Sequence, residues 1–399
     1  MATPAGFVAG AARGGIKMQG DDVALILSKR PATVAAVFTR NLVKAAPVLI
    51  CARHAANPTA RAIIANAGNA NCCTGEQGLA AAIAMCQLAA VRIGCDPHEV
   101  LVCSTGIIGH PLPMEQVEAA IGAIELGRVE ATNEAVARAV MTTDTRPKFC
   151  AARARINGHF VTIGGLAKGA GMIGPDMGPF TPPATLHATL LSFLTTDAAV
   201  PKALLQQALQ ETVERTFNSV TVDGDTSTND TCLLLANGAS GVQINDTNYA
   251  QFTALLNSVC VHLAKMVAAD GEGATKLVTV EVTGAATTAD ARHIAMTVAN
   301  SPLVKTAIFG GDPNWGRIAA AAGRAGVALD PAELSVALNE IEVFSGGEPT
   351  RFDLAEAEAA MQGDELTVHV ALAEGEAMWT AWTCDFSYDY VKINAEYHT

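Results

Sequence analysis

The spacing of apolar residues alternates along the chain between the two-residue period of strands and the 3.6-residue period of helices. Residues 76–93 and 248–269 carry apolar side chains on one helical face, so each segment predicts an amphipathic helix. Leu366, Val368 and Val370 alternate with other residues, which predicts a strand with one buried face. The chain therefore combines both kinds of element.

The same patterns extend over most of the chain. We expect strands at 23–28, 33–39, 46–51, 61–66, 99–104, 159–165, 277–283, 333–343, 365–372, 377–384 and 388–393. We expect helices at 76–93, 114–126, 248–269, 288–299, 315–325 and 353–361. A Lys-Arg-Pro sequence between the first two strands predicts a turn. Such a mixture is typical of sheets covered by helices, an α+β sandwich.

The length of the chain, 399 residues, exceeds what one core usually holds, so we expect two lobes or one large layered domain. No internal repeat, low-complexity stretch or Gly/Ser linker divides it. The proline-rich segment 175–183 is the natural boundary.

The net charge of −13 excludes some classes of partner. An acidic chain without a Lys/Arg cluster repels phosphate backbones and anionic lipid, so we expect no nucleic acid and no membrane partner. An anionic amino acid as ligand would need a local positive charge, for which Lys168 beside flexible glycines is the candidate.

The cysteines and histidines do not form metal-binding patterns. Ten cysteines lack CxxC spacing and are interpreted as reduced core thiols, while nine histidines lack HxH or HExxH spacing. We expect no metal and no cofactor. The N-terminal residues 1–17 lack a continuous apolar stretch behind a basic start, so a cytoplasmic protein is expected.

Two motifs imitate known ligand sites. Residues 169–174 match GxGxxG after a predicted strand, but the prolines that follow prevent the helix that a dinucleotide-binding motif must open. Residues 222–230, VDGDTSTND, resemble the first half of a calcium loop, but Thr228 replaces the required Gly and Leu234 the bidentate Glu. We interpret the first as a loop that carries Lys168 and the second as a hydrogen-bonded turn that supports a site.

The segment Ala188-Thr189 is a candidate for a hidden nucleophile. Thr189 follows a small residue and precedes apolar ones. Cleavage before Thr189 would create an α-amine, with a pKa near 7.7–8.0, within reach of its own hydroxyl. One cleavage would thus create both nucleophile and base, although most threonines in such runs only pack in a strand or cap a turn.

Seven motifs occur in the order found in one family. They are CSTGIIG (103–109), MTTDTRPK (141–148), KGAGMIGP (168–175), VDGDTSTND (222–230), DGEGATK (270–276), FGGDPNWGRI (309–318) and INAEYHT (393–399), and the match begins earlier, at GFVAGAARGGIK (6–17). The chain resembles the glutamate N-acetyltransferase (ornithine acetyltransferase) family of arginine biosynthesis along nearly its whole length. The resemblance implies a layered α/β/β/α-type sandwich of the DmpA-like kind.

The resemblance also implies a mechanism. The precursor cuts itself between Ala188 and Thr189 into an α chain, 1–188, and a β chain, 189–399, assembled as α2β2. Thr189 then moves an acetyl group from N2-acetylornithine to glutamate in a ping-pong reaction. Thr105 and Gly106 supply the oxyanion hole. The substrate-binding residues carried over from the motifs are Thr142, Lys168, Thr189, Glu272, Asn394 and Thr399.

The chain departs from the family pattern just before the nucleophile. Asp176 replaces the usual Asn, and residues 178–187 are inserted before Ala188. A second Ala-Thr-Leu makes Thr185 the second candidate nucleophile, and Thr181 is the third. The insertion either relaxes the strain that self-cleavage needs or forms a surface loop at small cost. The alternatives are a related N-terminal-nucleophile amidase or aminopeptidase, and an unprocessed, non-catalytic paralogue.

Overall fold

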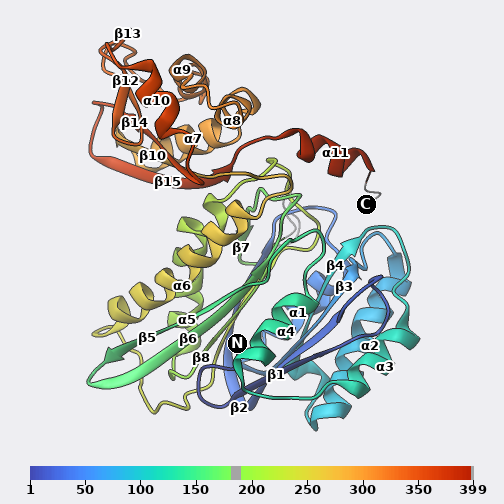
Figure 1. Ribbon diagram of the computed structural model, residues 1–399. Helices are drawn as coiled ribbons and strands as arrows, with labels where there is room; N and C mark the ends of the chain where they lie inside the picture. The colour runs from blue at the N-terminus through green and yellow to red at the C-terminus, as the bar shows by residue number, and fades with distance from the viewer. Residues whose placement is uncertain (181–189, 397–399) are drawn as a thin grey trace. The chain divides into compact units, whose positions relative to one another are not determined.

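A mixed sheet forms the centre of the first of two compact units. The computed structural model describes residues 1–180 and 190–396, and the first unit comprises residues 1–180, 190–218 and 225–264 of these. Nine strands of these described residues pair in the order β4-β3-β2-β9-β8-β6-β5, with β1 and β7 both on β2 (Figure 1). The strands are β1 Phe7–Ala12, β2 Val23–Thr39, β3 Thr59–Asn69, β4 Val100–Ile107, β5 Lys148–Ile156, β6 His159–Lys168, β7 Met177–Gly178, β8 Leu191–Thr196 and β9 Thr231–Ala236.

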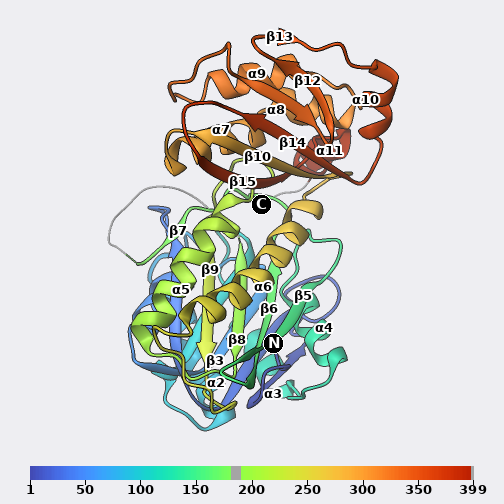
Figure 2. The same cartoon turned by 90° about the vertical axis from the view of Figure 1, so that its left-hand side faces the viewer.

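Helices cover both faces of this sheet. One face shares a hydrophobic core with α1 Ala46–Ala55, α2 Gly75–Ile93, α3 Met114–Ala123 and α4 Glu130–Ala139. The helices α5 Lys202–Arg215 and α6 Tyr249–Ala269 lie across the other face (Figure 2). Gly165 in β6 permits the close approach of α6, because a Cβ there would come within 2.8 Å of Leu263.

The helix α6 is also long and apolar enough, by length and composition alone, to cross a membrane, but half of its apolar window is buried inside the protein. Phe252, Leu256 and Leu263 are fully buried. The helix therefore has the character of a core helix.

The second unit, which comprises the described residues 219–224 and 265–396, has its own sheet and core. In its described part, strands pair in the order β13-β12-β11-β14-β10-β15, and buried valines of β10 and β14 pack against α7 and α9. The elements are β10 Leu277–Ala285, α7 Thr288–Ala299, α8 Pro302–Phe309, α9 Trp315–Gly323, β11 Ser335–Leu338, β12 Ile341–Ser345, β13 Glu348–Pro349, α10 Leu354–Ala360, β14 Glu365–Ala371, β15 Ala377–Cys384 and α11 Tyr388–Glu396. The expected α+β class is confirmed.

Most expected elements are present, but four expectations are wrong. Residues 46–51 belong to helix α1, whose run of buried side chains has no strand-like alternation and whose Pro47 suits the first helical turn. Residues 388–393 belong to helix α11, where the Ser387 hydroxyl accepts a hydrogen bond from the backbone N–H of Asp389. The segment 46–51 is apolar throughout, and periodicity alone does not distinguish a helix from a strand in so short an apolar run.

The other two errors concern turns. The expected Lys-Arg-Pro turn lies inside the continuous strand β2, where the pairing with β3 shifts register between Leu27 and Ala32. Pro31 is tolerated in this irregular stretch because no ladder bond needs its missing N–H. Residues 333–343 form two strands, β11 and β12, because Asn339 adopts a positive φ of 51° in the turn between them.

The segment expected to be cut begins and ends in the same sheet. The strand β7, just before it, pairs with β2, and β8, just after it, pairs with both β6 and β9. In the strand order, β8 and β9 lie between β2 and β6. A cut between residues 188 and 189 would therefore leave two chains that share one sheet.

Candidate active site

Lys168 is the centre of a polar cluster in the first unit. It is the last residue of β6, and its side chain is 1% exposed. Its Nζ donates hydrogen bonds to Thr105 Oγ1 and Thr142 Oγ1, each at 3.1 Å. Three residues expected to act together, from widely separated parts of the chain, are thus in direct contact.

Asp144 forms hydrogen bonds that hold residues around Lys168 in place. The sequence alone did not identify it as a site residue. It accepts hydrogen bonds from Lys148 Nζ at 2.6 Å and from the backbone N–H groups of Gly169 and Thr142. Burial opposes ionisation, but the charges of Lys168 and Lys148 outweigh it and hold the pKa of the Asp144 carboxyl below its usual range. The signal was available, since Asp144 lies within the MTTDTRPK motif.

Gly106 can only be glycine. It follows Thr105 near the end of β4, where the pairing with β3 shifts register around Asn69. Its φ is +131°, and a Cβ at this position would lie 2.3 Å from the carbonyl carbon of Gly68. The backbone at Thr105-Gly106 therefore adopts a conformation that other residues do not permit.

The VDGDTSTND segment is a hydrogen-bonded turn, as predicted. Asn229 Nδ2 donates to the carbonyl oxygens of Ala70 and Ser104 at 2.7 and 2.8 Å, and its Oδ1 accepts from Thr228 Oγ1. The bond to Ser104 holds the residue that precedes Thr105. The segment thus supports the candidate oxyanion strand.

Asp230, the last residue of this segment, was also missed by sequence reasoning. It is fully buried, and its Oδ1 accepts a hydrogen bond from the backbone N–H of Leu190. Burial raises the pKa of the Asp230 carboxyl well above its usual value, although the positive charge of Lys168 opposes this shift. The one sequence signal for Asp230 is its position as the last residue of the VDGDTSTND motif.

In the second unit, Glu272 and Asn394 come together across 122 residues of sequence. Asn394 Nδ2 donates to Glu272 Oε2 at 2.9 Å, and Glu272 is 8% exposed. Gly273 next to it has a φ of +70°, and a Cβ there would lie 2.5 Å from the backbone nitrogen of Tyr390. The two expected substrate residues of this unit therefore form one pair.

The remaining expected residues lie outside the described part of the chain. They are Ala188 and Thr189, the alternative nucleophiles Thr185 and Thr181, and Thr399. The residue next to the expected nucleophile, Leu190, is described and buried. Its backbone N–H is held by Asp230, and its carbonyl accepts from Thr231 N at 3.0 Å.

The GxGxxG stretch does not open a helix. Residues 169–176 contain no helical turn, and Gly169 uses its N–H to bond Asp144. A pyrophosphate group held at a helix N-terminus is therefore excluded here. In residues 1–180 and 190–396, no three His, Cys, Asp or Glu side chains gather as a metal site.

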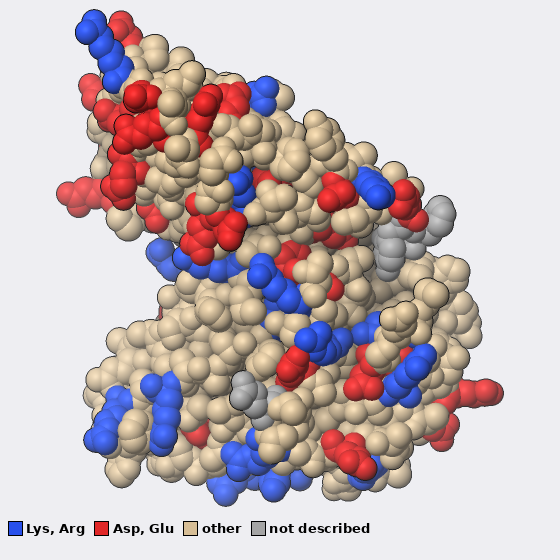
Figure 3. Space-filling view, in the orientation of Figure 1, with Lys and Arg blue, Asp and Glu red and all other residues tan. Residues whose placement is uncertain are grey.

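Charge is distributed unevenly along the chain. Of the 39 Asp and Glu residues, 20 fall in residues 265–399, against 8 of the 26 Lys and Arg. Figure 3 shows acidic side chains gathered on the second unit. Buried lysines occur in both units, Lys148 and Lys168 in the first and Lys305 in the second.

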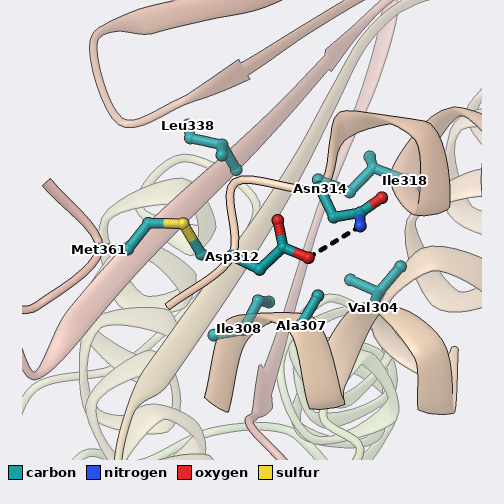
Figure 4. Close-up of a pocket in the computed structure, with 8 residues that line it drawn as sticks. All are labelled: Val304, Ala307, Ile308, Asp312, Asn314, Ile318, Leu338 and Met361. Atoms are coloured by element: carbon teal, nitrogen blue, oxygen red, sulfur yellow. Dashed lines mark hydrogen bonds between the residues drawn. The ribbon is translucent and has the colours of Figure 1, made fainter. Parts of the chain in front are cut away.

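A small pocket in the second unit belongs to the packing of the fold and is not a ligand site. It is lined by Val304, Ala307, Ile308, Asp312, Asn314, Ile318, Leu338 and Met361 (Figure 4). Asn314 Nδ2 donates to Asp312 Oδ2 at 2.9 Å, and Asn314 Oδ1 accepts from Arg317 N at the start of α9. The space is too narrow for a water molecule. The FGGDPNWGRI motif here caps a helix.

Comparison with known proteins gives one consistent family. A model of the ArgJ family matches residues 8–399. The chain is 48% identical over 402 residues to the arginine biosynthesis bifunctional protein ArgJ of Symbiobacterium thermophilum, covering 99% of this chain and 98% of that protein.

Two solved structures are also similar to this chain. The crystal structure of the arginine biosynthesis bifunctional protein ArgJ from Bacillus halodurans has a TM-score of 0.50 at 43% identity, and covers 51% of this chain and 97% of the solved chain. The ornithine acetyltransferase from Mycobacterium tuberculosis, solved with ornithine, is 36% identical over 44% of this chain and 95% of its own, with a TM-score of 0.40.

Proposed function

The chain belongs to the ArgJ family of arginine-biosynthesis enzymes, and from this premise we propose that it is a self-cleaving glutamate N-acetyltransferase. It takes the acetyl group from N2-acetylornithine and gives it to glutamate. Its relatives are named bifunctional. We propose acetyl transfer to glutamate from acetyl-CoA as the second activity. The observation that carries the site assignment is the contact of buried Lys168 with Thr105 and Thr142.

Thr189 is the nucleophile in this proposal. Its hydroxyl attacks the acetyl carbonyl carbon while its own α-amine takes the proton. Ornithine leaves, and an acetyl-threonine ester remains until glutamate attacks it. The position at the start of β8 supports this role, since Leu190 is held on both sides by Asp230 and Thr231. A neighbouring residue that is already held in place orients the nucleophile, so little conformational entropy is lost at the moment of reaction.

Thr105 and Gly106 hold the oxyanion. Negative charge gathers on one oxygen in the tetrahedral intermediate, and one such donor is worth roughly 10²–10³ in rate. The glycine-only backbone at Gly106 and the support of Ser104 by Asn229 favour this assignment. Lys168 adds a positive charge next to the same strand end.

Substrate binding is divided among several residues. Lys168 and Thr142 bind the acidic end of the amino acid, and Glu272, oriented by Asn394, binds the amine of ornithine. Thr399 completes this set. The charges of Lys168 and Lys148 keep Asp144 ionised, and Asp144 orients the backbone of Thr142 and Gly169.

The active form is an α2β2 assembly in the cytoplasm, made of chains 1–188 and 189–399. The interleaved strands β8 and β9 explain how the two chains stay together after the cut. The solved Bacillus halodurans chain supports the division, because it is matched almost completely by only 51% of this chain. Each proposed chain has about that length.

Intact mass and N-terminal sequencing of the purified protein test the proposal. Two fragments, one starting at Thr189, are expected, and Thr189→Ala is expected to abolish both cleavage and acetyl transfer. A fragment starting at Thr185 would move the nucleophile by four residues, to the first of the two Ala-Thr-Leu sequences. Transfer that survives in Thr189→Ala would overturn the assignment, and so would a single uncleaved chain without activity. Transfer to glutamate rather than to water separates this enzyme from an amidase.

A further inference from the structure

Lys17 joins the loop that follows β1 to the segment between α4 and β5. Its Nζ donates hydrogen bonds to the carbonyl oxygens of Arg138, Ala139 and Met141, at 3.2, 3.1 and 3.1 Å. An ammonium group has three protons to donate, and three acceptors are in place for them. The Lys17 side chain thus holds the C-terminal end of α4 and the residues that follow it.

A buried carboxylate fixes the loop that carries Lys17. Asp22 is fully buried, and its two carboxyl oxygens accept hydrogen bonds from the backbone N–H groups of residues 14–17. The backbone of Asp22 is anchored as well, because its carbonyl oxygen accepts from Ala67 N at 2.8 Å. The loop therefore presents Lys17 from a fixed place at the end of the sheet.

Lys17 and Asp144 bind the two ends of the same peptide group. Lys17 Nζ donates to the carbonyl oxygen of Met141, and the N–H of the next residue, Thr142, donates to Asp144 Oδ2 at 3.0 Å. Oxygen and N–H belong to the one peptide bond that joins Met141 to Thr142. A cation at the oxygen and an anion at the N–H both match the dipole of that bond, and such charge-assisted hydrogen bonds are the strong ones. The backbone of Thr142 is thereby held in one orientation.

The stem of Lys17 packs beside the other threonine that bonds to Lys168. A Cβ at Gly68 would lie 3.0 Å from Lys17 Cγ, so the two are in close contact. Gly68 pairs with Gly106 in the register of β3 and β4, and Gly106 follows Thr105, whose Oγ1 accepts from Lys168 Nζ. Lys17 thus contacts residues next to both partners of Lys168.

We propose that Lys17 is a positioning residue of the acetyl-transfer site, which fixes the peptide group before Thr142 so that the hydroxyl of Thr142 stays at Lys168. This proposal rests on the proposed function, in which Lys168 and Thr142 bind the acidic end of the amino-acid substrate. Lys17 acts through Thr142 and not on the reacting atoms.

The charges around Lys17 agree with this role. Burial lowers the pKa of its ammonium group, and the carboxylates of Asp22, Asp144 and Asp21 oppose that shift. The positive charge of Lys168 adds to the lowering. Lys17 therefore belongs to the same electrostatic cluster as Lys168 and Asp144.

Lys202 provides a matched control, because it makes the same kind of contact at another helix. Its Nζ donates to three carbonyl oxygens at the end of α1, those of Ala55, Ala56 and Asn57. The strand β8 begins at Leu191, which is paired with Lys168, and Lys202 lies beyond the other end of that strand. Lys202→Met therefore removes a similar helix cap away from the site.

Steady-state kinetics separate positioning from stability. Lys17→Met keeps a stem of similar length but loses the ammonium group. The KM values for N2-acetylornithine and for glutamate should both rise, each roughly two- to tenfold, while kcat changes less than about twofold. A merely structural role would reduce the amount of active enzyme, which lowers kcat and leaves KM unchanged. Lys202→Met should leave both KM values at the wild-type level.

Two further variants make the comparison independent of one substitution. Lys17→Arg retains the charge and the donors, and should recover most of the wild-type KM. Lys17→Gln retains donors without the charge, and its KM values should lie between those of Lys17→Arg and Lys17→Met. Wild-type KM values in both Lys17→Met and Lys17→Gln would overturn the proposal.

Hydrogen exchange of the backbone amides tests the positioning without acetyl transfer. The N–H of Thr142 is bonded to Asp144, and it should exchange roughly two- to tenfold faster in Lys17→Met than in wild type. Lys17→Arg and Lys202→Met should keep the wild-type rate, as mass spectrometry of a peptide that contains Thr142 would show. If the wild-type protein transfers no acetyl group while exchange follows this pattern, the proposed function is wrong and the contact of Lys17 with the Thr142 peptide stands. Unchanged exchange in Lys17→Met would overturn the proposal.

Discussion

Asn229 donates its side-chain amide to the carbonyl oxygen of Ser104, 125 residues earlier in the chain, at 2.8 Å. The same nitrogen donates to the carbonyl of Ala70 at 2.7 Å. One buried side chain thus joins the end of β4, the loop after β3 and the turn before β9. This junction determines where Thr105 is placed relative to Lys168.

Replacement of Asn229 by Ala should destabilise the protein. Two carbonyl oxygens would lose their donor, and the free energy of unfolding should fall by about 1–3 kcal/mol. Urea unfolding measures this loss. Thr247→Ala, which removes an exposed hydroxyl bonded to Asn245, serves as the control and should change little. Equal stability of the two variants would contradict the structural role given to Asn229.

Replacement of Gly106 by Ala should prevent normal folding of the site. The added Cβ would meet the backbone of Gly68 and Asn69 at 2.3 and 2.5 Å, and neither can move as a flexible side chain does. We expect a loss of soluble protein or a fall in the melting temperature.

The helical Gly122 provides a matched control for Gly106, since it has open space around its Cβ position. Gly122→Ala should stabilise the protein by about 0.5–1 kcal/mol, because Ala loses less conformational freedom in a helix. Thermal unfolding of both variants checks the prediction. A Gly106→Ala protein as stable as wild type would show that the β3–β4 approach is looser than described.

The stability of the protein should depend on pH through Asp144. Its pKa is depressed in the folded state, so its contribution is fully present above the pKa of an unfolded Asp, about 3.9. That contribution is lost as the pH falls from about 4 toward the lower pKa of the folded state. In Asp144→Asn this dependence should be absent.

Urea unfolding between pH 7 and pH 3 makes the comparison. The stability difference between wild type and Asp144→Asn should be large at pH 7 and shrink on acidification. Asp176→Asn is the control, because Asp176 forms only a half-exposed ion pair with Arg40. A constant difference between wild type and Asp144→Asn across this range would argue against an ionised Asp144 in the folded protein.

The elements with strong periodicity could be predicted from sequence. The expected helices at 76–93 and 248–269 are present. Apolar residues that recur every 3.6 positions come together on one face only when the segment forms a helix. The expected strands at 46–51 and 388–393 are wrong, since the first segment is buried at every position except Leu49 and the second has no buried residue. In neither segment does the spacing of apolar residues indicate whether the backbone forms a helix or a strand.

The site was partly predictable for a different reason. The resemblance named Thr105, Thr142 and Lys168, and their contacts support the choice. Asp144 and Asp230 were not named, because a carboxylate within a polar motif has no local pattern that shows it will be buried. Their burial follows from the sheet, which brings residues 144, 168 and 230 together.

The sequence by itself determined the class of fold, the order of its motifs and the family, because these depend on residue type and spacing along the chain. Only the tertiary structure decided which charges are buried and which partner each one has. It also placed β8 and β9, which follow the expected cut in the sequence, between β2 and β6, which precede it. Ionisation and strand order depend on contacts between residues far apart in sequence, and such contacts exist only in the folded chain.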